Sequence, residues 1–442
     1  MTVDANLTYR KIFRVWSPLA ATWLMMSAEG PFLAAIIARL EDPVYNLAAY
    51  GVAFSFAIIV EAPIIMMLSA STALVKDWDS FLRLRNFTYV LNVLITAVML
   101  FVLWTPVFDW LTRDVILLPS PVADLTHRSL AIMLPWPAAI GFRRFFQGLM
   151  IRRGLTRRIG YGTAIRVSTM AAIAFLLYRF FSVPGAIVGA AALSGGVVVE
   201  SVVTRFMASR AVKEIREAPP LEQNEHLTAR RIVDFYLPLA LTSVISLAVH
   251  PMVTYSLGRS HQALESLAVF PVIASVTFIF RSTALSYQEV AIAFLDDRRE
   301  NFRRLARFAT VLGVAATLGL MLIAFTPLSA VWFHDISGLS LELTEFSVLP
   351  LKILSFMPFF SVLLAFQRSI MVFGRNTRPL TMASVLEVAS IIAILFLAIH
   401  VFDMVGAVAA TTALLLGRLV GNAYLFFPTV FVLRATRNLS AR

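Results

Sequence analysis

The sequence contains no cysteine, and only 14% of its 442 residues are charged. Without cysteine there can be no disulfide, no thiolate metal ligand and no lipid attached through sulfur. A soluble domain is usually about a quarter charged. With 59% hydrophobic residues, this chain cannot cover its apolar surface in water. The composition therefore indicates an integral membrane protein.

The sequence also lacks the short motifs of common enzyme and metal sites. It has no His-Glu-x-x-His zinc motif, no phosphate-binding Gly-x-x-x-x-Gly-Lys loop and no nucleophile elbow. We therefore expect no catalytic residue, no metal site and no cofactor, and the protein is not expected to be an enzyme. Any transport would be driven by a substrate gradient or an ion gradient, with H⁺ or Na⁺ as the possible coupling ion.

Twelve apolar segments fill the chain, and most reach the ~20 residues that a membrane-spanning helix needs. Strands of a membrane barrel would alternate apolar and polar residues, and these segments do not. The sequence thus predicts an all-α membrane protein with twelve transmembrane helices. The segments are residues 12–37, 47–74, 87–111, 128–150, 160–181, 184–208, 232–256, 264–294, 308–333, 346–373, 379–401 and 404–432.

The second half of the chain repeats the first. Prolines and glycines hold the register, as in the pairs Pro31/Pro251, Pro137/Pro358 and Gly154/Gly374. We therefore expect two pseudo-symmetric six-helix lobes, residues 1–208 and 232–442, joined by a polar linker at 209–231. In transporters with such repeats the substrate site lies at the repeat interface, near the bilayer midplane.

The net charge of +12 is concentrated in the connections that follow even-numbered segments, in the linker and at both termini. The positive-inside rule places these parts in the cytoplasm, and the bias toward arginine suggests a bacterial inner membrane. The basic residues are dispersed over short loops, so nucleic-acid binding is not expected. The expected partners are a small-molecule substrate and membrane lipid, and we expect a monomer.

Charged residues inside the apolar segments are costly, and they are the candidates for a functional site. Arg281 and Glu61 occupy the same repeat position. Arg281 would hold an anionic substrate, with Glu61 as counter-ion or proton carrier; the alternative is an ion pair that ties the halves together. Arg143 and Arg144 point ~100° apart on a helix, so one of them could join this site. Glu289, eight residues after Arg281, is a further candidate; the alternative is a solvated, cap-like role near the cytoplasmic end of the helix.

Two other groups of charges suggest coupling and gating. Glu29 lies beside a Gly-Pro kink in the first segment, where an apolar setting disfavours its ionised form; this favours a role as proton carrier, the alternative being a partner for backbone groups freed at the kink. His250 stands near the equivalent place in the second half and could titrate as well; the alternative is a histidine held by hydrogen bonds in a structural role. Arg166 and Glu387 form a second swapped pair and would close an inner gate; the alternative is a purely structural ion pair. Long side chains near helix ends can reach the membrane surface, and we interpret three other arginines as such anchors: Arg205, Arg368 and Arg418.

Three stretches at the start of the chain resemble a known family. They are Pro18-Leu19, Ala28-Glu29-Gly30-Pro31 and Leu47-Ala48-Ala49-Tyr50-Gly51-Val52-Ala53-Phe54-Ser55. Together with two sets of six helices, they resemble the multidrug and toxic compound extrusion (MATE) transporters of the MOP flippase superfamily. The first two segments are most similar to the progressive ankylosis protein family.

This resemblance implies an inverted-V pair of lobes and export by alternating access. The ankylosis family is associated with small anions such as citrate, ATP and pyrophosphate, which agrees with the arginines in the apolar segments. Three alternatives stay open: a proton- or sodium-coupled exporter of organic cations, a flippase for lipid-linked precursors, and a non-transporting membrane scaffold.

Overall fold

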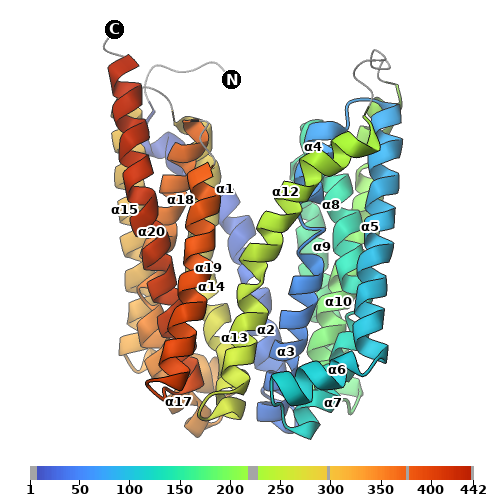
Figure 1. Ribbon diagram of the computed structural model, residues 1–442, viewed down its shortest axis with the longest axis vertical. Helices are drawn as coiled ribbons and strands as arrows, with labels where there is room; N and C mark the ends of the chain where they lie inside the picture. The colour runs from blue at the N-terminus through green and yellow to red at the C-terminus, as the bar shows by residue number, and fades with distance from the viewer. Residues whose placement is uncertain (1–6, 218–226, 296–298, 375–377, 440–442) are drawn as a thin grey trace. The chain divides into compact units, whose positions relative to one another are not determined.

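The computed structural model describes residues 7–217, 227–295, 299–374 and 378–439 (Figure 1). Within these ranges the chain is helical, and the one β-bridge joins His261 to Val405. The chain divides into two compact units. Unit 1 contains Met1–Ala35 and Arg259–Arg442, and unit 2 contains Ile36–Gly258.

Unit 2 is built on an apolar core in which the buried Phe81, Phe145 and Phe146 pack beside Ile64 and Met67. The rings of Phe145 and Phe146 stand edge to face, with centroids 5.1 Å apart. A π-helical turn, Trp110–Val115, follows α6. The helices of unit 2 are α3 (Pro43–Glu61), α4 (Met67–Leu74), α5 (Trp78–Trp104), α6 (Val107–Asp109), α7 (Ser120–Ile132), α8 (Pro135–Arg152), α9 (Arg157–Phe180), α10 (Gly185–Met207), α11 (Ser209–Arg216), α12 (Ala229–Leu247) and α13 (Val249–Gly258).

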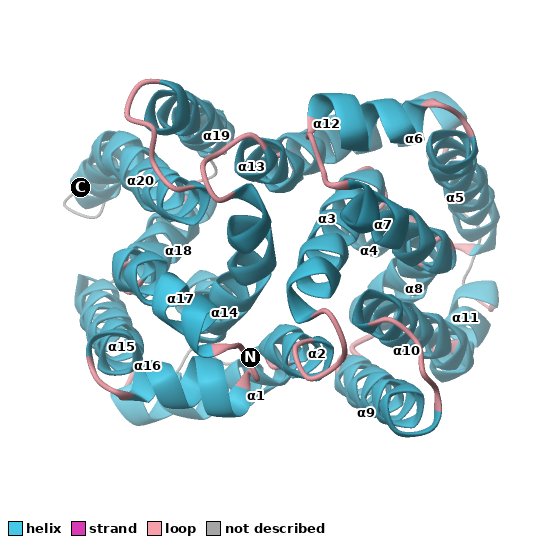
Figure 2. Cartoon of the chain, turned by 90° about the horizontal axis from the view of Figure 1, so that it is seen from below, coloured by secondary structure: helices cyan, strands magenta, loops and turns pink. Residues whose placement is uncertain are grey.

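Unit 1 has its own core, centred on the fully buried Tyr287, whose hydroxyl donates a hydrogen bond to the Leu305 carbonyl at 2.9 Å. Figure 2 shows α14, α18 and α20 grouped together in this unit, and all three pairs are in contact. A second π-helical turn covers Val331–Ile336. The helices are α1 (Tyr9–Ser27), α2 (Glu29–Ile37, up to the unit boundary), α14 (Ala263–Phe294), α15 (Arg299–Phe325), α16 (Leu328–Ala330), α17 (Leu341–Leu354), α18 (Met357–Phe373), α19 (Arg378–His400) and α20 (Gly406–Leu439).

The compact units are divided differently from the expected lobes 1–208 and 232–442. The first helix α1 packs with the second half of the chain: the Trp16 ring lies 5.7 Å from that of Phe308. Helix α12 packs with the first half, where the Tyr236 hydroxyl donates a hydrogen bond to the Pro63 carbonyl at 2.5 Å. The unit boundaries follow tertiary packing, and each half of the sequence gives its first segment to the other unit.

Proline explains where the first and seventh segments break. Pro31 has no N–H with which to bond the carbonyl four residues earlier, and the helix is interrupted at Ala28, between α1 and α2. The break recurs in the second half, where Pro251 follows an interruption at Ala248, between α12 and α13. The two prolines occupy equivalent positions of the repeat, and each half of the chain has a break in its first helix at that position.

The second and eighth segments differ, although they occupy equivalent repeat positions. Helix α3 ends at Glu61 and is followed by a turn that contains Pro63, after which α4 begins at Met67. Helix α14 runs without interruption from Ala263 to Phe294. Thr283 stands where the first half has Pro63, so α14 keeps its backbone hydrogen bonds through the region that carries Arg281.

The fold class is confirmed, and the helix count is close to that expected. Eleven helices in the described part of the chain are long and apolar enough to cross a membrane. The expected segment 128–150 is helical but is not one of them. It is divided between α7 and α8 at Met133 and Leu134, and α8 carries Arg143, Arg144 and Arg152. Within this segment Arg128 of α7 and Arg143 and Arg144 of α8 lower the mean hydropathy, which explains why it does not qualify by composition.

Candidate functional site

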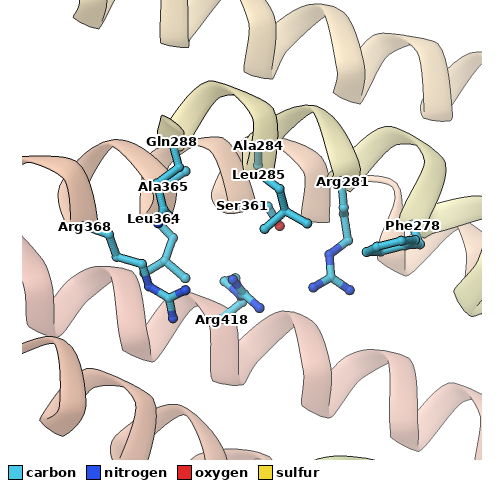
Figure 3. A pocket seen from close by; sticks show the side chains of 10 residues that line it. All are labelled: Phe278, Arg281, Ala284, Leu285, Gln288, Ser361, Leu364, Ala365, Arg368 and Arg418. Carbon is cyan, nitrogen blue, oxygen red and sulfur yellow. The ribbon is translucent and has the colours of Figure 1, made fainter. Parts of the chain in front are cut away.

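A small pocket in unit 1 brings three arginines together (Figure 3). Arg281 comes from α14, Arg368 from α18 and Arg418 from α20. In Figure 3 their guanidinium groups extend into a common space between these three helices. The volume is about 60 Å³, and the other lining residues are Phe278, Ala284, Leu285, Gln288, Ser361, Leu364 and Ala365.

Helical periodicity explains how the pocket is assembled. Arg281, Leu285 and Gln288 are four and then three residues apart, so they lie on one stripe of α14. Ser361, Leu364 and Arg368 form the matching stripe of α18. Two adjacent helices thus present their polar residues to the same space.

The pocket has more positive charge than its neighbours neutralise. Glu387 on α19 pairs with Arg418, with 2.9 Å between Oε1 and Nη2. Among the described residues, Arg281 and Arg368 form no ion pair, and the buried Nε of Arg281 has no hydrogen-bond acceptor. Glu387 is the carboxylate that interacts electrostatically with both of them. The site as described carries three guanidinium groups against one carboxylate.

Unit 2 contains a second buried charge cluster, which is more nearly balanced. Glu200 on α10 is completely buried and pairs with Arg143 of α8 and, at 3.6 Å, with Arg166 of α9. Gln147 of α8 donates a hydrogen bond to Glu200 at 3.4 Å. Glu61, only 5% exposed, has Arg144 as its foremost charged neighbour.

Glycines bring the helices close enough to form both ion pairs. A Cβ at Gly162 of α9 would lie 3.4 Å from Oε1 of Glu200. A Cβ at Gly421 of α20 would lie 3.3 Å from Oε2 of Glu387. In each unit a glycine on the facing helix therefore leaves room for the buried carboxylate.

The predicted site residues separate into these two clusters and a dispersed remainder. Arg281 lines the pocket of unit 1, while Glu61, Arg143 and Arg144 belong to the cluster of unit 2. Glu289 does not line the pocket; it accepts a hydrogen bond from the Trp23 indole of α1 at 3.3 Å, and its neighbour Gln288 faces the pocket instead.

The candidates for ion coupling lie elsewhere. Glu29 is the first residue of α2, directly after the break at Ala28, and is partly exposed. His250 is exposed on α13, and its ring centroid lies 6.3 Å from that of Phe54. Their roles in coupling remain predictions.

Two expectations from the sequence need correction. Arg368 and Arg418 are not surface anchors, because both line the pocket. Arg418 is flanked by Gly417 and Gly421, and glycines that allow close helix packing are the sequence signal that could have placed it inside the protein. Arg205 is exposed, as expected of an anchor, and lies over the Phe146 ring at 5.1 Å.

Arg166 and Glu387, the expected gating pair, each have a partner within their own unit. Arg166 pairs with Glu200, and Glu387 pairs with Arg418. The polarity of the two pairs is exchanged: the fifth segment supplies the arginine in unit 2, and the eleventh supplies the carboxylate in unit 1. An inner gate built from Arg166 and Glu387 remains a prediction.

No family model matches the sequence, and no curated protein matches it. Several solved structures are similar to this chain. A multidrug resistance MATE family transporter of the MOP superfamily, in an inward-facing conformation, is 14% identical with a TM-score of 0.73, covering 96% of this chain and 99% of its own. The lipid II flippase MurJ is 15% identical with a TM-score of 0.70, covering 93% of this chain and 87% of its own.

A third similar structure is a MOP superfamily transporter from Pyrococcus furiosus, described as having a binding pocket of reverse polarity. It is 15% identical with a TM-score of 0.65 over 96% of both chains. At these identities the likeness defines the fold. The chain is an integral membrane protein with the fold of the MATE transporters of the MOP superfamily.

The buried cluster of unit 2 predicts a large loss of stability when its carboxylate is neutralised. Glu200→Gln would leave Arg143 and Arg166 without their shared counter-charge, so we expect the free energy of unfolding to fall by about 3–5 kcal/mol. Denaturant unfolding of the purified protein in detergent measures this loss.

Glu214→Gln is the matched control. Glu214 pairs with Arg210 at 2.9 Å, but the two side chains are 37% and 66% exposed. An exposed pair of this kind contributes less than about 1 kcal/mol. Equal effects of the two substitutions would contradict a special role for the buried cluster.

Proposed function

We propose that the protein is a secondary active transporter that exports a small organic or phosphorylated anion by alternating access. The observation that carries this proposal is the pocket of unit 1, where Arg281, Arg368 and Arg418 converge with Glu387 as their carboxylate neighbour. Guanidinium groups present a planar fork of donors that matches a carboxylate or a phosphate. Citrate, pyrophosphate and nucleotide-like anions, the substrates associated with the progressive ankylosis family, fit this chemistry.

The same pocket disfavours an exporter of organic cations. A site for cations would place carboxylates or aromatic faces toward the ligand. The lining holds one aromatic ring, Phe278, and no carboxylate. Glu387 is not among the lining residues, and it is already paired with Arg418.

A flippase for a lipid-linked precursor is the second candidate, because the head of such a lipid can also be an anionic phosphate. The arginine pocket supports this class as well as the first. A water-soluble anion and a lipid-linked anion must therefore be compared in the binding experiment.

The substrate site predicts a specific effect of Arg281. Citrate, pyrophosphate or ADP should raise the unfolding temperature of the purified protein, since a ligand that binds the folded state stabilises it. Arg281→Ala should weaken the apparent affinity by about tenfold to a hundredfold, the equivalent of ~1.5–3 kcal/mol for hydrogen bonds to a charged group. Thermal unfolding at constant ionic strength, titrated with each anion, measures both effects.

Arg179→Ala serves as the control, because Arg179 lies over the Phe180 ring at the end of α9 and outside the pocket. Its affinity for anions should equal that of the wild type. Stabilisation by tetraphenylphosphonium in wild type and Arg281→Ala alike, with no effect of anions, would instead support the cation exporter. Stabilisation by a lipid pyrophosphate alone would support the flippase.

We further propose that Glu29 carries the coupling proton, with His250 as a second titrating group. Glu29 lies at a break in the first segment, where the chain can change its bend and move the carboxylate between environments. Glu29→Gln should abolish the response of anion transport to an imposed pH gradient while anion binding is retained. Proteoliposome uptake, with and without the gradient, tests this; a full response in the variant would assign coupling to another group or to Na⁺.

Both termini and the linker 209–231 are proposed to lie in the cytoplasm of a bacterial inner membrane. The absence of cysteine allows single-cysteine labelling without a background. A membrane-impermeant maleimide applied to intact cells should label Ser182→Cys, between α9 and α10, and leave Lys213→Cys on α11 unlabelled. Both residues are exposed, so the opposite pattern would invert the topology.

A further inference from the structure

Glu387 does not line the arginine pocket, but it pairs with an arginine that does. Its carboxylate pairs with Arg418 at 2.9 Å, and the two side chains are only 13% and 15% exposed. Arg418 lines the pocket, and Glu387 does not. The backbone of α20 approaches this carboxylate at Gly421, so Glu387 is held against the same helix that carries Arg418.

Charge balance then limits what the pocket can hold. Three guanidinium groups face the space, and Glu387 neutralises one of them, which leaves two positive charges. Uncompensated charge away from water is costly, and a ligand of opposite charge lowers that cost. A ligand with two negative charges balances the pocket, whereas a singly charged ligand leaves one guanidinium without a counter-charge.

The size and lining of the pocket limit the ligand further. Its volume of about 60 Å³ is small beside the ~300–1,000 Å³ of pockets that enclose whole drug-sized ligands. Ala284, Leu285, Leu364 and Ala365 supply apolar walls, and Gln288 and Ser361 add polar groups. The space suits one compact head group, with any larger part of the molecule outside it.

We propose that the arginine pocket selects a compact head group with two negative charges, such as a phosphate monoester, and that Glu387 sets this selectivity by neutralising Arg418. The inference rests on the proposed function and narrows its substrate class. Glu387 acts through Arg418 and does not touch the ligand.

Two ligands of similar size and shape test the charge preference. At pH 8 methyl phosphate carries two negative charges and methanesulfonate carries one. From thermal unfolding titrations at fixed ionic strength, the wild type should bind methyl phosphate about tenfold more tightly, because each unit charge in a partly desolvated site changes affinity by about this factor. Equal affinities would overturn the proposal.

Two variants test the role of Glu387. Glu387→Gln raises the pocket charge by one, so the preference for methyl phosphate should increase about tenfold over that of the wild type. The double variant Glu387→Gln with Arg418→Gln restores the original net charge, and its preference should return toward the wild-type value. A residue that only positioned Arg418 would not show this return, so an unchanged ratio in Glu387→Gln or no return in the double variant would overturn the proposal.

The same unfolding measurement in detergent micelles distinguishes a water-soluble ligand from a lipid that carries the same head group. Dioleoyl phosphatidate carries a phosphate monoester on a lipid, and dioleoyl phosphatidylcholine is its control. Stabilisation by methyl phosphate and not by phosphatidate supports a soluble ligand. Stabilisation by both, with tighter binding of phosphatidate, supports a lipid with the same head group, and stabilisation by neither would overturn the proposal.

Arg281→Ala separates the two proposals. Anion stabilisation that survives in Arg281→Ala would overturn the proposed function together with this inference. Stabilisation that disappears in Arg281→Ala but has the same charge preference in wild type and Glu387→Gln would overturn the role of Glu387 alone.

Discussion

Arginines held away from water need counter-charges close by, because an uncompensated buried charge is costly. Each unit buries guanidinium groups among its helices and must supply counter-charge for them. Unit 2 places Glu200 between Arg143 and Arg166, with Glu61 near Arg144. Unit 1 supplies Glu387 for Arg418 and leaves Arg281 and Arg368 facing a pocket. Unit 2 thus sets two carboxylates against three arginines, whereas unit 1 sets one carboxylate against three, and this larger excess of positive charge marks unit 1 as the candidate binding site.

The two clusters also show how one repeated plan can yield two roles. The same pair of segments carries the buried ion pair in each unit, but the polarity is reversed: Arg166 and Glu200 in one, Glu387 and Arg418 in the other. The glycine that makes room for the carboxylate is reversed with it, from Gly162 on the fifth segment to Gly421 on the twelfth. Because of this reversal, the arginine of the unit 1 pair is Arg418 on α20, and it faces α14 and α18.

Much of this could be predicted from the sequence. Long apolar runs predicted the helices, the repeat pointed to Arg281, and Pro31 and Pro251 indicated the kinks. The pocket was only partly predicted, because distance from a helix end suggests a surface anchor, whereas helix packing determines which face an arginine presents; Arg368 and Arg418 were misplaced for this reason. The separate partners of Arg166 and Glu387, and the unit that receives α1, are likewise products of tertiary contacts between segments distant in the sequence.

Each half of the sequence supplies its first helix to the unit formed mainly by the other half, and this determines where the chain crosses between the units. Among the residues that the structure describes, the chain passes from one unit to the other at Ala35–Ile36 and at Gly258–Arg259. The described parts of the polar linker that divides the sequence into halves, residues 209–217 and 227–231, belong to unit 2, and residues 218–226 lie outside the described part of the chain. A chain cut in that linker would give two fragments of similar length, yet each fragment would contribute helices to both units. The obvious boundary in the sequence is therefore not the place where the protein can be taken apart, and co-expressed halves would have to interleave to rebuild either unit.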